Sequence, residues 1–167
     1  MDISIVIVSL ILVGSVFVPY YFFILAGNSE AKKLKTKYRA AIAKNNLKVS
    51  QMETWGNSFI AIDTHQKKLI FMKVYETECN EQLVDLSKIK ETKIIQTKKS
   101  VKTKNGVNDL LEKLDLEILL VNGERIILNF YDSNQIYAED FELKRIEKWK
   151  AIVFEHIKTV HTEERAA

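Results

Sequence analysis

The chain has 167 residues, a formal net charge of +3 and one cysteine, Cys79. A single cysteine excludes an internal disulfide, which is typical of proteins from a reducing compartment. The only proline, Pro19, lies in the apolar opening, so the rest of the chain has no proline-rich linker and is predicted to form one compact domain.

An uncharged opening segment, Ile3–Ala26, is followed closely by five cations: Lys32, Lys33, Lys35, Lys37 and Arg39. As a helix this segment rises about 36 Å, enough to cross a hydrocarbon layer of about 30 Å. Because basic residues concentrate on the cytoplasmic side of a span, we expect the N-terminus outside and the rest of the chain in the cytoplasm, at the plasma membrane. The sequence therefore predicts a single-pass transmembrane helix over residues 1–27.

The alternative interpretation of this opening is a cleaved export signal, which would leave an exported, soluble domain that binds a small ligand. Export signals begin with positive charge and have a shorter apolar centre. This chain begins with Asp2 and has no Lys or Arg before Lys32. Leu25-Ala26-Gly27 is also a weak cleavage site, so the uncleaved anchor is the favoured prediction.

A break and a new helix are predicted after the apolar segment, where Gly27-Asn28-Ser29 offers a helix N-cap. Apolar residues then recur at helical spacing: Ala31, Leu34, Tyr38, Ala41 and Ile42. The pattern predicts an amphipathic juxtamembrane helix within residues 28–50, with a basic outer face.

From Ser58 the pattern changes to short apolar or alternating runs separated by polar turns. It predicts strands at Ser58–Asp63, Lys68–Tyr75, Glu81–Leu86, Ile89–Gln96, Leu114–Leu120 and Arg125–Phe130. Thr64–Lys67 is expected to connect the first two tightly. Asn122 and Gly123 predict a type I′ hairpin turn, since both tolerate a positive φ. One face of the strand before that turn is expected to pack on a core through Leu114, Leu116, Ile118 and Leu120.

A final helix of about 20 residues is predicted after Asp132 or Ser133, either of which can cap it. Its apolar stripe consists of Ile146, Trp149, Ile152, Val153, His156, Ile157 and Val160. Asp140 and Lys144 are spaced for an i,i+4 ion pair on the exposed side. Trp149 is expected to be buried against the strands.

A run of short strands followed by one amphipathic helix resembles the pleckstrin-homology-like superfold in its small bacterial versions. Phe59–Asp63 and Lys68–Lys73 look like the opening hairpin of such domains, Val84–Ile89 resembles the passage from their third to their fourth strand, and Leu128–Asp132 resembles their last strand. The resemblance implies an α+β fold: a two-sheet antiparallel β-barrel or sandwich over residues 51–160, closed by the C-terminal helix, with a tail at 161–167. Such domains usually have seven strands, and the seventh is either Lys99–Lys104 or a segment near Gln51–Trp55.

No catalytic or metal-binding constellation is apparent. His65, His156 and His161 fall in a turn, the last helix and the tail, and no pairing among them is predicted. The glycines are too scattered for a phosphate-binding loop, and no metal-ligand spacing occurs. Carboxylates at strand ends are expected to make turns and caps: Asp63, Asp85 and Asp132. We therefore expect no cofactor and no enzymatic activity.

Lysine is concentrated a second time between Lys88 and Lys104. The candidate contacts to an anionic surface are Lys32, Lys33, Lys35, Lys37, Arg39, Lys98, Lys99, Lys102 and Lys104. A protein partner or anionic lipid headgroups could use them. Nucleic acid is not expected, because the second segment has no arginine or aromatic residue for base contacts. A solvated loop around Ser100–Asn108 is the alternative.

These observations predict a non-catalytic binding or scaffold module, anchored in the membrane and docking a partner protein or the nearby membrane surface. An anchor raises the effective concentration of a weakly binding domain, so weak contacts could suffice. The exported carrier remains the main alternative. An enzyme with an unrecognised polar pocket is a third class that linear spacing does not exclude.

Overall fold

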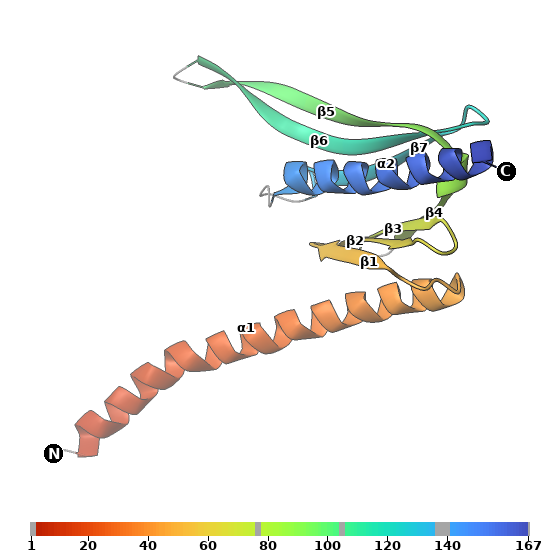
Figure 1. The fold of residues 1–167 in the computed structure, drawn as a ribbon. Helices are drawn as coiled ribbons and strands as arrows, with labels where there is room; N and C mark the ends of the chain where they lie inside the picture. Colours follow the sequence, from red (N-terminus) through yellow and green to blue (C-terminus); the bar gives the residue numbers. More distant parts are fainter. Residues whose placement is uncertain (1–2, 76–77, 104–105, 136–140, 167) are drawn as a thin grey trace. The chain divides into compact units, whose positions relative to one another are not determined.

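The computed structural model of the protein describes residues 3–75, 78–103, 106–135 and 141–166, with the backbone alone at 3–11, 20, 22–31, 101–103, 106–108 and 158–166. The chain divides into two compact units, Met1–Asn46 and Leu47–Ala167. Among the described residues, the first unit holds one long helix, α1, and the second holds strands β1 to β7 in two antiparallel sheets with a C-terminal helix, α2 (Figure 1).

Helix α1 (Ile3–Lys44) is continuous. The break predicted at Gly27-Asn28-Ser29 is therefore wrong, because the backbone stays helical through these residues. A glycine inside a helix costs only about 1 kcal/mol relative to alanine, which is too little to end a helix that good helix formers continue on both sides. Pro19 also lies inside α1.

Over the described part of the chain, the structure contains no helix that could span a membrane. The transmembrane helix predicted over residues 1–27 is therefore wrong. Among the side chains described at the uncharged N-terminal end of α1 are those of residues 12–19 and 21. Its large apolar side chains are exposed: Leu12, Val13, Val16, Phe17, Val18 and Tyr21.

The first sheet pairs its strands in chain order: β1 (Gln51–Trp55), β2 (Ser58–Asp63), β3 (Lys68–Val74) and β4 (Cys79–Asp85). The predicted bounds of β2 are confirmed, and β3 ends one residue earlier than predicted. β1 confirms the second of the two positions considered for a seventh strand. All six residues of β2 are buried, as expected for an inner strand.

The second sheet is built on a long hairpin, β5 (Ile89–Thr103) and β6 (Gly106–Leu120), with β7 (Arg125–Asp132) beside β6. β7 pairs with β6 only from Lys113 to Leu119, so β5 and β6 continue past it as a two-stranded ribbon (Figure 1). The loop predicted around Ser100–Asn108 is wrong for its described residues, which pair across this ribbon.

Neither sheet closes into a barrel, so the PH-like β-barrel considered for residues 51–160 is wrong; the described strands form two open antiparallel sheets. The 3₁₀ helix η1 (Leu86–Lys88) turns the chain between β4 and β5, and the Asp85 carboxylate caps it by accepting the Ser87 backbone N–H at 3.0 Å. β4 pairs with β3 alone and β5 with β6 alone, so the described strands form two separate open sheets. The α+β composition itself is observed.

The β6–β7 hairpin is present, but its predicted type I′ turn is wrong. Gly123 has a φ of 88°, whereas Asn122 is absent from the described residues with positive φ. The Gly123 N–H donates to the Leu120 carbonyl at 3.0 Å, and the Asn122 side chain accepts the Glu124 N–H at 3.0 Å. Asn122 therefore acts through its side-chain oxygen, and only the glycine adopts the left-handed conformation.

Helix α2 (Glu142–Ala166) begins later and ends later than predicted. Asp132 does not cap it, because Asp132 ends β7 and accepts the Asn134 backbone N–H at 3.0 Å. Asp140, the predicted partner of Lys144, lies outside the described residues, as does the side chain of Val160. The rest of the predicted stripe is confirmed: Ile146, Trp149, Val153 and Ile157 are buried, and Ile152 and His156 are half-buried.

One core joins both sheets and α2. The predicted core face of β6 is confirmed, since Leu114, Leu116, Ile118 and Leu120 are all buried. Trp55 of β1 stacks on Phe130 of β7 with ring centroids 5.0 Å apart, and its indole N–H donates to the Phe130 carbonyl at 3.2 Å. This pair ties the edge strands of the two sheets together without a strand ladder.

Candidate interaction surfaces

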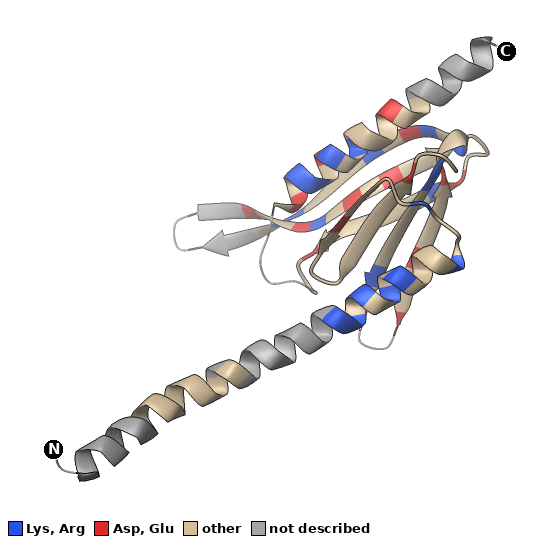
Figure 2. Ribbon diagram, turned by 60° about the horizontal axis from the view of Figure 1, so that its bottom comes forward, with Lys and Arg blue, Asp and Glu red and all other residues tan. Residues whose placement is uncertain are grey.

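Five of the predicted anionic-surface contacts lie on α1: Lys32, Lys33, Lys35, Lys37 and Arg39. We call them the basic surface of α1. All five side chains are exposed, and none forms an ion pair with a described residue. Figure 2 shows this run of basic residues along the second half of α1. Tyr38 and Ala41 of the same stretch are buried, so the helix presents its charged side chains to solvent.

The other predicted contacts belong to the second unit, and the described ones lie on β5. Lys98 and Lys99 are exposed on β5. Only the backbone of Lys102 is described, and Lys104 lies outside the described residues. The lysine-rich segment is therefore strand where it is described, and its cations follow the edge of a sheet.

The described histidines have separate local roles. His65 is exposed in the β2–β3 turn, and the half-buried His156 ring Nδ1 lies 2.8 Å from the Ile152 carbonyl of its own helix. The side chain of His161 is not described. Over the described residues, no group of three or more His, Cys, Asp or Glu side chains is arranged to hold a metal ion. Cys79 is a free, exposed thiol at the start of β4.

The strand-end aspartates make turns and caps, as predicted. The buried Asp63 carboxylate accepts the backbone N–H groups of His65 and Gln66 at 2.9 Å and that of Lys48 at 2.6 Å. Burial alone would raise the pKa of Asp63, but these hydrogen bonds together hold the pKa below its ordinary value. The carboxylates of all three accept hydrogen bonds from nearby backbone N–H groups: Asp63, Asp85 and Asp132.

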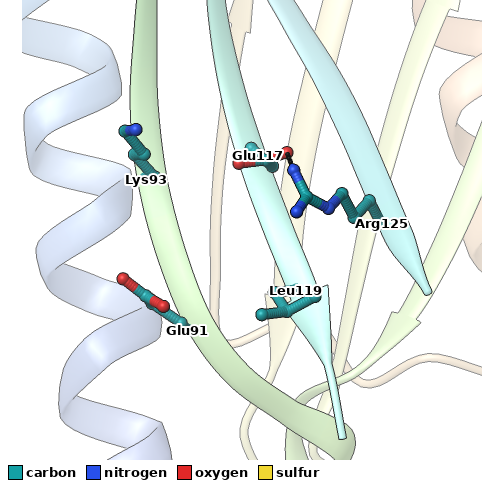
Figure 3. Close-up of a pocket in the computed structure, with 5 residues that line it drawn as sticks. All are labelled: Glu91, Lys93, Glu117, Leu119 and Arg125. Carbon is teal, nitrogen blue, oxygen red and sulfur yellow. Dashed lines mark hydrogen bonds and ion pairs between the residues drawn. The ribbon is translucent and has the colours of Figure 1, made fainter. Parts of the chain in front are cut away.

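A shallow cavity of about 220 Å³ opens on the outer face of the second sheet (Figure 3). Five side chains from three neighbouring strands line it: Glu91, Lys93, Glu117, Leu119 and Arg125. Arg125 Nη1 donates to Glu117 Oε1 at 3.0 Å, so one cation and one carboxylate of the set already satisfy each other. These residues include no nucleophile paired with a base, and the cavity is smaller than the sites that usually enclose a ligand.

A lysine buried in the second unit was not anticipated. Lys73 on β3 is 1% exposed, and its ammonium donates to Asn129 Oδ1 on β7 at 2.5 Å. The Asn129 amide in turn donates to Asp115 Oδ1 at 2.6 Å. Burial lowers the pKa of Lys73; the charges of Asp132 and Asp115 oppose that shift without cancelling it, and Lys113 adds to it. The sequence carries one signal: Lys73 continues the inward-facing series of Leu69 and Phe71.

Glu53 on β1 joins the first sheet to α2. Its carboxylate accepts Arg145 Nε at 2.8 Å, Lys148 Nζ at 2.9 Å and the Trp149 indole N–H at 2.9 Å. The Arg145 guanidinium also lies 4.9 Å from the centre of the Trp55 ring. Burial would raise the pKa of Glu53, but the three hydrogen bonds and the charge of Lys148 together lower the pKa below its ordinary value of 4.5.

Replacing Glu53 with glutamine is expected to lower the free energy of unfolding by about 1.5–3 kcal/mol at pH 7, the usual range for hydrogen bonds to a charged group. Because the folded-state pKa is lowered, the carboxylate stabilises the protein above pH 4.5, and this contribution is lost as the pH falls through the lowered pKa. Urea denaturation of the wild type and of Glu53→Gln, measured from pH 7 into the acid range, should show that the difference in their free energies of unfolding decreases as the pH falls. The matched control is Glu147→Gln, an exposed glutamate of α2, with an expected effect below about 0.5 kcal/mol. A difference that stays constant with pH would contradict this assignment.

Comparison with known proteins gives no relative for this chain: no protein-family model, no curated protein and no solved structure matches it. The resemblance to PH-like domains therefore stays a prediction from sequence, without the closed barrel that it implied.

Proposed function

We propose that the chain is a non-catalytic binding module that docks an acidic surface of a partner protein through the basic surface of α1. The observation that carries the proposal is the set of five exposed cations on one helix, unpaired with any described residue. Lys32, Lys35 and Arg39 follow one side of the helix at i, i+3 and i+7, so an acidic surface could contact all three together.

The chemistry of this stretch favours a protein surface over a lipid surface. Helices that lie in the headgroup layer insert an apolar face among the lipids. Between Lys32 and Lys44, the large apolar side chains are buried or half-buried, and the exposed positions are basic, threonine or alanine. From Lys32 to Lys44 the exposed side chains are therefore charged or small, whereas the exposed large apolar side chains of α1 lie earlier in the helix, between Leu12 and Tyr21.

The binding test uses a fluorescent polyglutamate peptide and the full chain, with affinity measured by anisotropy at 50 and 200 mM salt. Triple substitution of Lys32, Lys35 and Arg39 with glutamine is expected to weaken binding about tenfold, because each exposed contact contributes several tenths of a kcal/mol. Higher salt should weaken binding by the wild type, since screening shortens the range of exposed charges to about 10 Å at 0.1 M. Glutamine keeps the helix propensity of the replaced residues.

The matched control removes three exposed cations from β5, Lys90, Lys93 and Lys99, by the same change to glutamine. This variant has the same net charge as the α1 variant and is expected to bind within about threefold of wild type, because all five cations of the basic surface of α1 remain in place. Equal losses in the two variants would show a response to net charge and overturn the proposal. Tighter binding to vesicles of 30% phosphatidylserine in phosphatidylcholine than to the peptide would assign the surface to lipid instead.

A further inference from the structure

The first half of α1 carries a wide face of exposed, large apolar side chains. Its members are 55–66% exposed and, at 3.6 residues per turn, share about half of the helix circumference: Leu12, Val13, Val16, Phe17 and Tyr21. We call these five residues the apolar face of α1. The other side of the same turns carries Gly14, Ser15, Val18 and Pro19. The large side chains are therefore gathered mainly on one side of the helix, and the small ones lie on the other.

The same side of α1 is covered farther along the helix. Leu34 follows Val16 by five whole turns of about 3.6 residues, so the two side chains lie on the same side. Leu34 is half-buried, and Tyr38 and Ala41, which follow it at i+4 and i+7, are buried. One apolar stripe therefore runs along α1, buried in the second half of the helix and exposed between Leu12 and Tyr21.

The apolar face of α1 is large enough to form an interface. A side chain of this kind exposes about 100 Å², so the five side chains together offer about 500 Å² on each chain. The largest apolar patch of a typical monomer is about 300–600 Å² and often marks an interaction site. Two such faces packed together would bury about 1,000 Å², which reaches the lower limit for a specific protein–protein interface.

We propose that the apolar face of α1 packs against the same face of a second copy of this chain, with the two helices antiparallel. The face carries no charge, so its occupant must be apolar over the same length, and an identical helix meets both conditions. A twofold axis beside Val16 and Phe17 lets the two faces overlap along their whole length. This interface goes beyond the function proposed for the basic surface of α1 and uses other residues of the helix.

The basic surface of α1 determines the orientation of the pair. In a parallel pair, the five cations between Lys32 and Arg39 would lie beside the same five cations of the second chain, at the 8–10 Å that separates packed helices. In an antiparallel pair about Val16, the two sets lie at opposite ends and are at least about 45 Å apart, because a helix rises 1.5 Å per residue. Screening removes repulsion over that distance, since the Debye length is about 10 Å at 0.1 M salt. The antiparallel pair therefore buries the apolar face without bringing the cations together.

Sedimentation velocity of the full chain, at concentrations up to about 200 µM, measures the dimer. Val16→Lys is expected to weaken dimerisation at least about tenfold, because it brings two ammonium groups together at the twofold axis. Val18→Lys is the matched control: Val18 is also an exposed valine, at 53%, but it lies on the opposite side of the helix, and the change should weaken dimerisation less than about threefold. Circular dichroism confirms that both variants are folded.

Chemical cross-linking tests the orientation. The experiment uses a Cys79→Ser background, because Cys79 is a free, exposed thiol, and a short bismaleimide that joins two cysteines. A mixture of Leu12→Cys and Tyr21→Cys chains is expected to give the mixed product, since antiparallel packing places Leu12 beside Tyr21 of the partner subunit. Cross-linking of Leu12→Cys to itself without the mixed product would overturn the antiparallel arrangement.

Two further outcomes would overturn the proposal. A wild type that stays monomeric at about 200 µM rules out the second copy and leaves the face to a different partner. Equal losses for Val16→Lys and Val18→Lys would show apolar clustering without a defined face. Substitution of Lys32, Lys35 and Arg39 with glutamine keeps the apolar face, so that variant should dimerise like the wild type, and Val16→Lys should still bind the polyglutamate peptide within about threefold. The dimer and the docking of an acidic surface can therefore fail separately.

Discussion

Replacing Trp149 with alanine is expected to lower the free energy of unfolding by about 3–5 kcal/mol, the range for truncating a core tryptophan. The ring is 1% exposed and belongs to the core that joins both sheets to α2. The change also removes the indole N–H that donates to Glu53, so a carboxylate loses one of its three donors. Since domains of this size are stabilised by only about 5–15 kcal/mol, the variant should be close to its limit of stability.

Urea denaturation followed by far-UV circular dichroism measures this effect. Phe154→Ala serves as the control because it truncates an aromatic side chain of the same helix that is 49% exposed. Its expected cost is below about 1 kcal/mol, as for most surface substitutions. Similar losses for the two substitutions would mean that α2 does not depend on its inner face for stability.

Replacing Lys73 with alanine is expected to lower the free energy of unfolding by about 3 kcal/mol. Lys73→Met is expected to lower it by less than about 1 kcal/mol. Alanine removes a long buried side chain and leaves a cavity, while methionine fills most of that space without a charge. Burial lowers the pKa of Lys73 because the charged ammonium is removed from water. Methionine carries no charge and therefore avoids this unfavourable desolvation. The hydrogen bond to Asn129 is lost in both variants, so their difference reports on packing.

The pH dependence gives an independent readout for Lys73. With the folded-state pKa below 10.5, the unfolded chain binds more protons between the two values, so the stability of the wild type should rise as the pH rises toward 10.5. The quantity to compare is the difference in stability between wild type and Lys73→Met, which removes the contributions common to both proteins and should change with pH in that direction. If Lys73→Met lowers the free energy of unfolding as much as Lys73→Ala does, the contacts of the ammonium stabilise the protein more than its burial destabilises it.

The sequence predicted the parts of the fold in which an apolar period is strong. β2 lies between turn residues and is apolar throughout its centre, and the inner face of β6 repeats every second residue, so both were identified. The stripe of α2 was identified for the same reason. β1 was harder, because its residues are mostly polar and only Trp55 is buried. Its pairing with β2 decides its structure, and that is a long-range interaction.

The ribbon, the start of α2 and the opening helix show where local patterns fail. In the outer halves of β5 and β6 the described side chains are exposed or half-buried, so the alternation that identifies a strand is weak there, and the many lysines suggested a loop. Asp132 has the right chemistry for a helix cap but is used in the turn after β7. Hydropathy suggested a span at Ile3–Ala26, which the described part of α1 does not support.

The candidate sites were predicted less well than the fold, because they depend on residues that are distant in sequence. The exposed cations of α1 could be identified from composition alone. One groove of the second unit is lined by Lys98 of β5, Leu111 of β6 and Phe141 before α2, and no pattern along the chain relates these residues. Glu53 and Arg145 meet only because β1 and α2 pack together. Only the burial of Lys73 had a signal in the sequence, because this lysine stands at a position of β3 that faces inward.

β5 is an edge strand of its sheet, and an exposed edge strand can pair with a strand of another molecule. One side of this strand pairs with β6, and its other side presents backbone N–H and carbonyl groups that a strand from another molecule could join. Lys90, Lys93, Lys98 and Lys99 are exposed along it. If the β5 strands of two molecules approached each other, their lysines would lie close together. The resulting charge repulsion opposes aggregation through these edge strands. The second cluster of lysines therefore protects solubility whether or not any partner binds it.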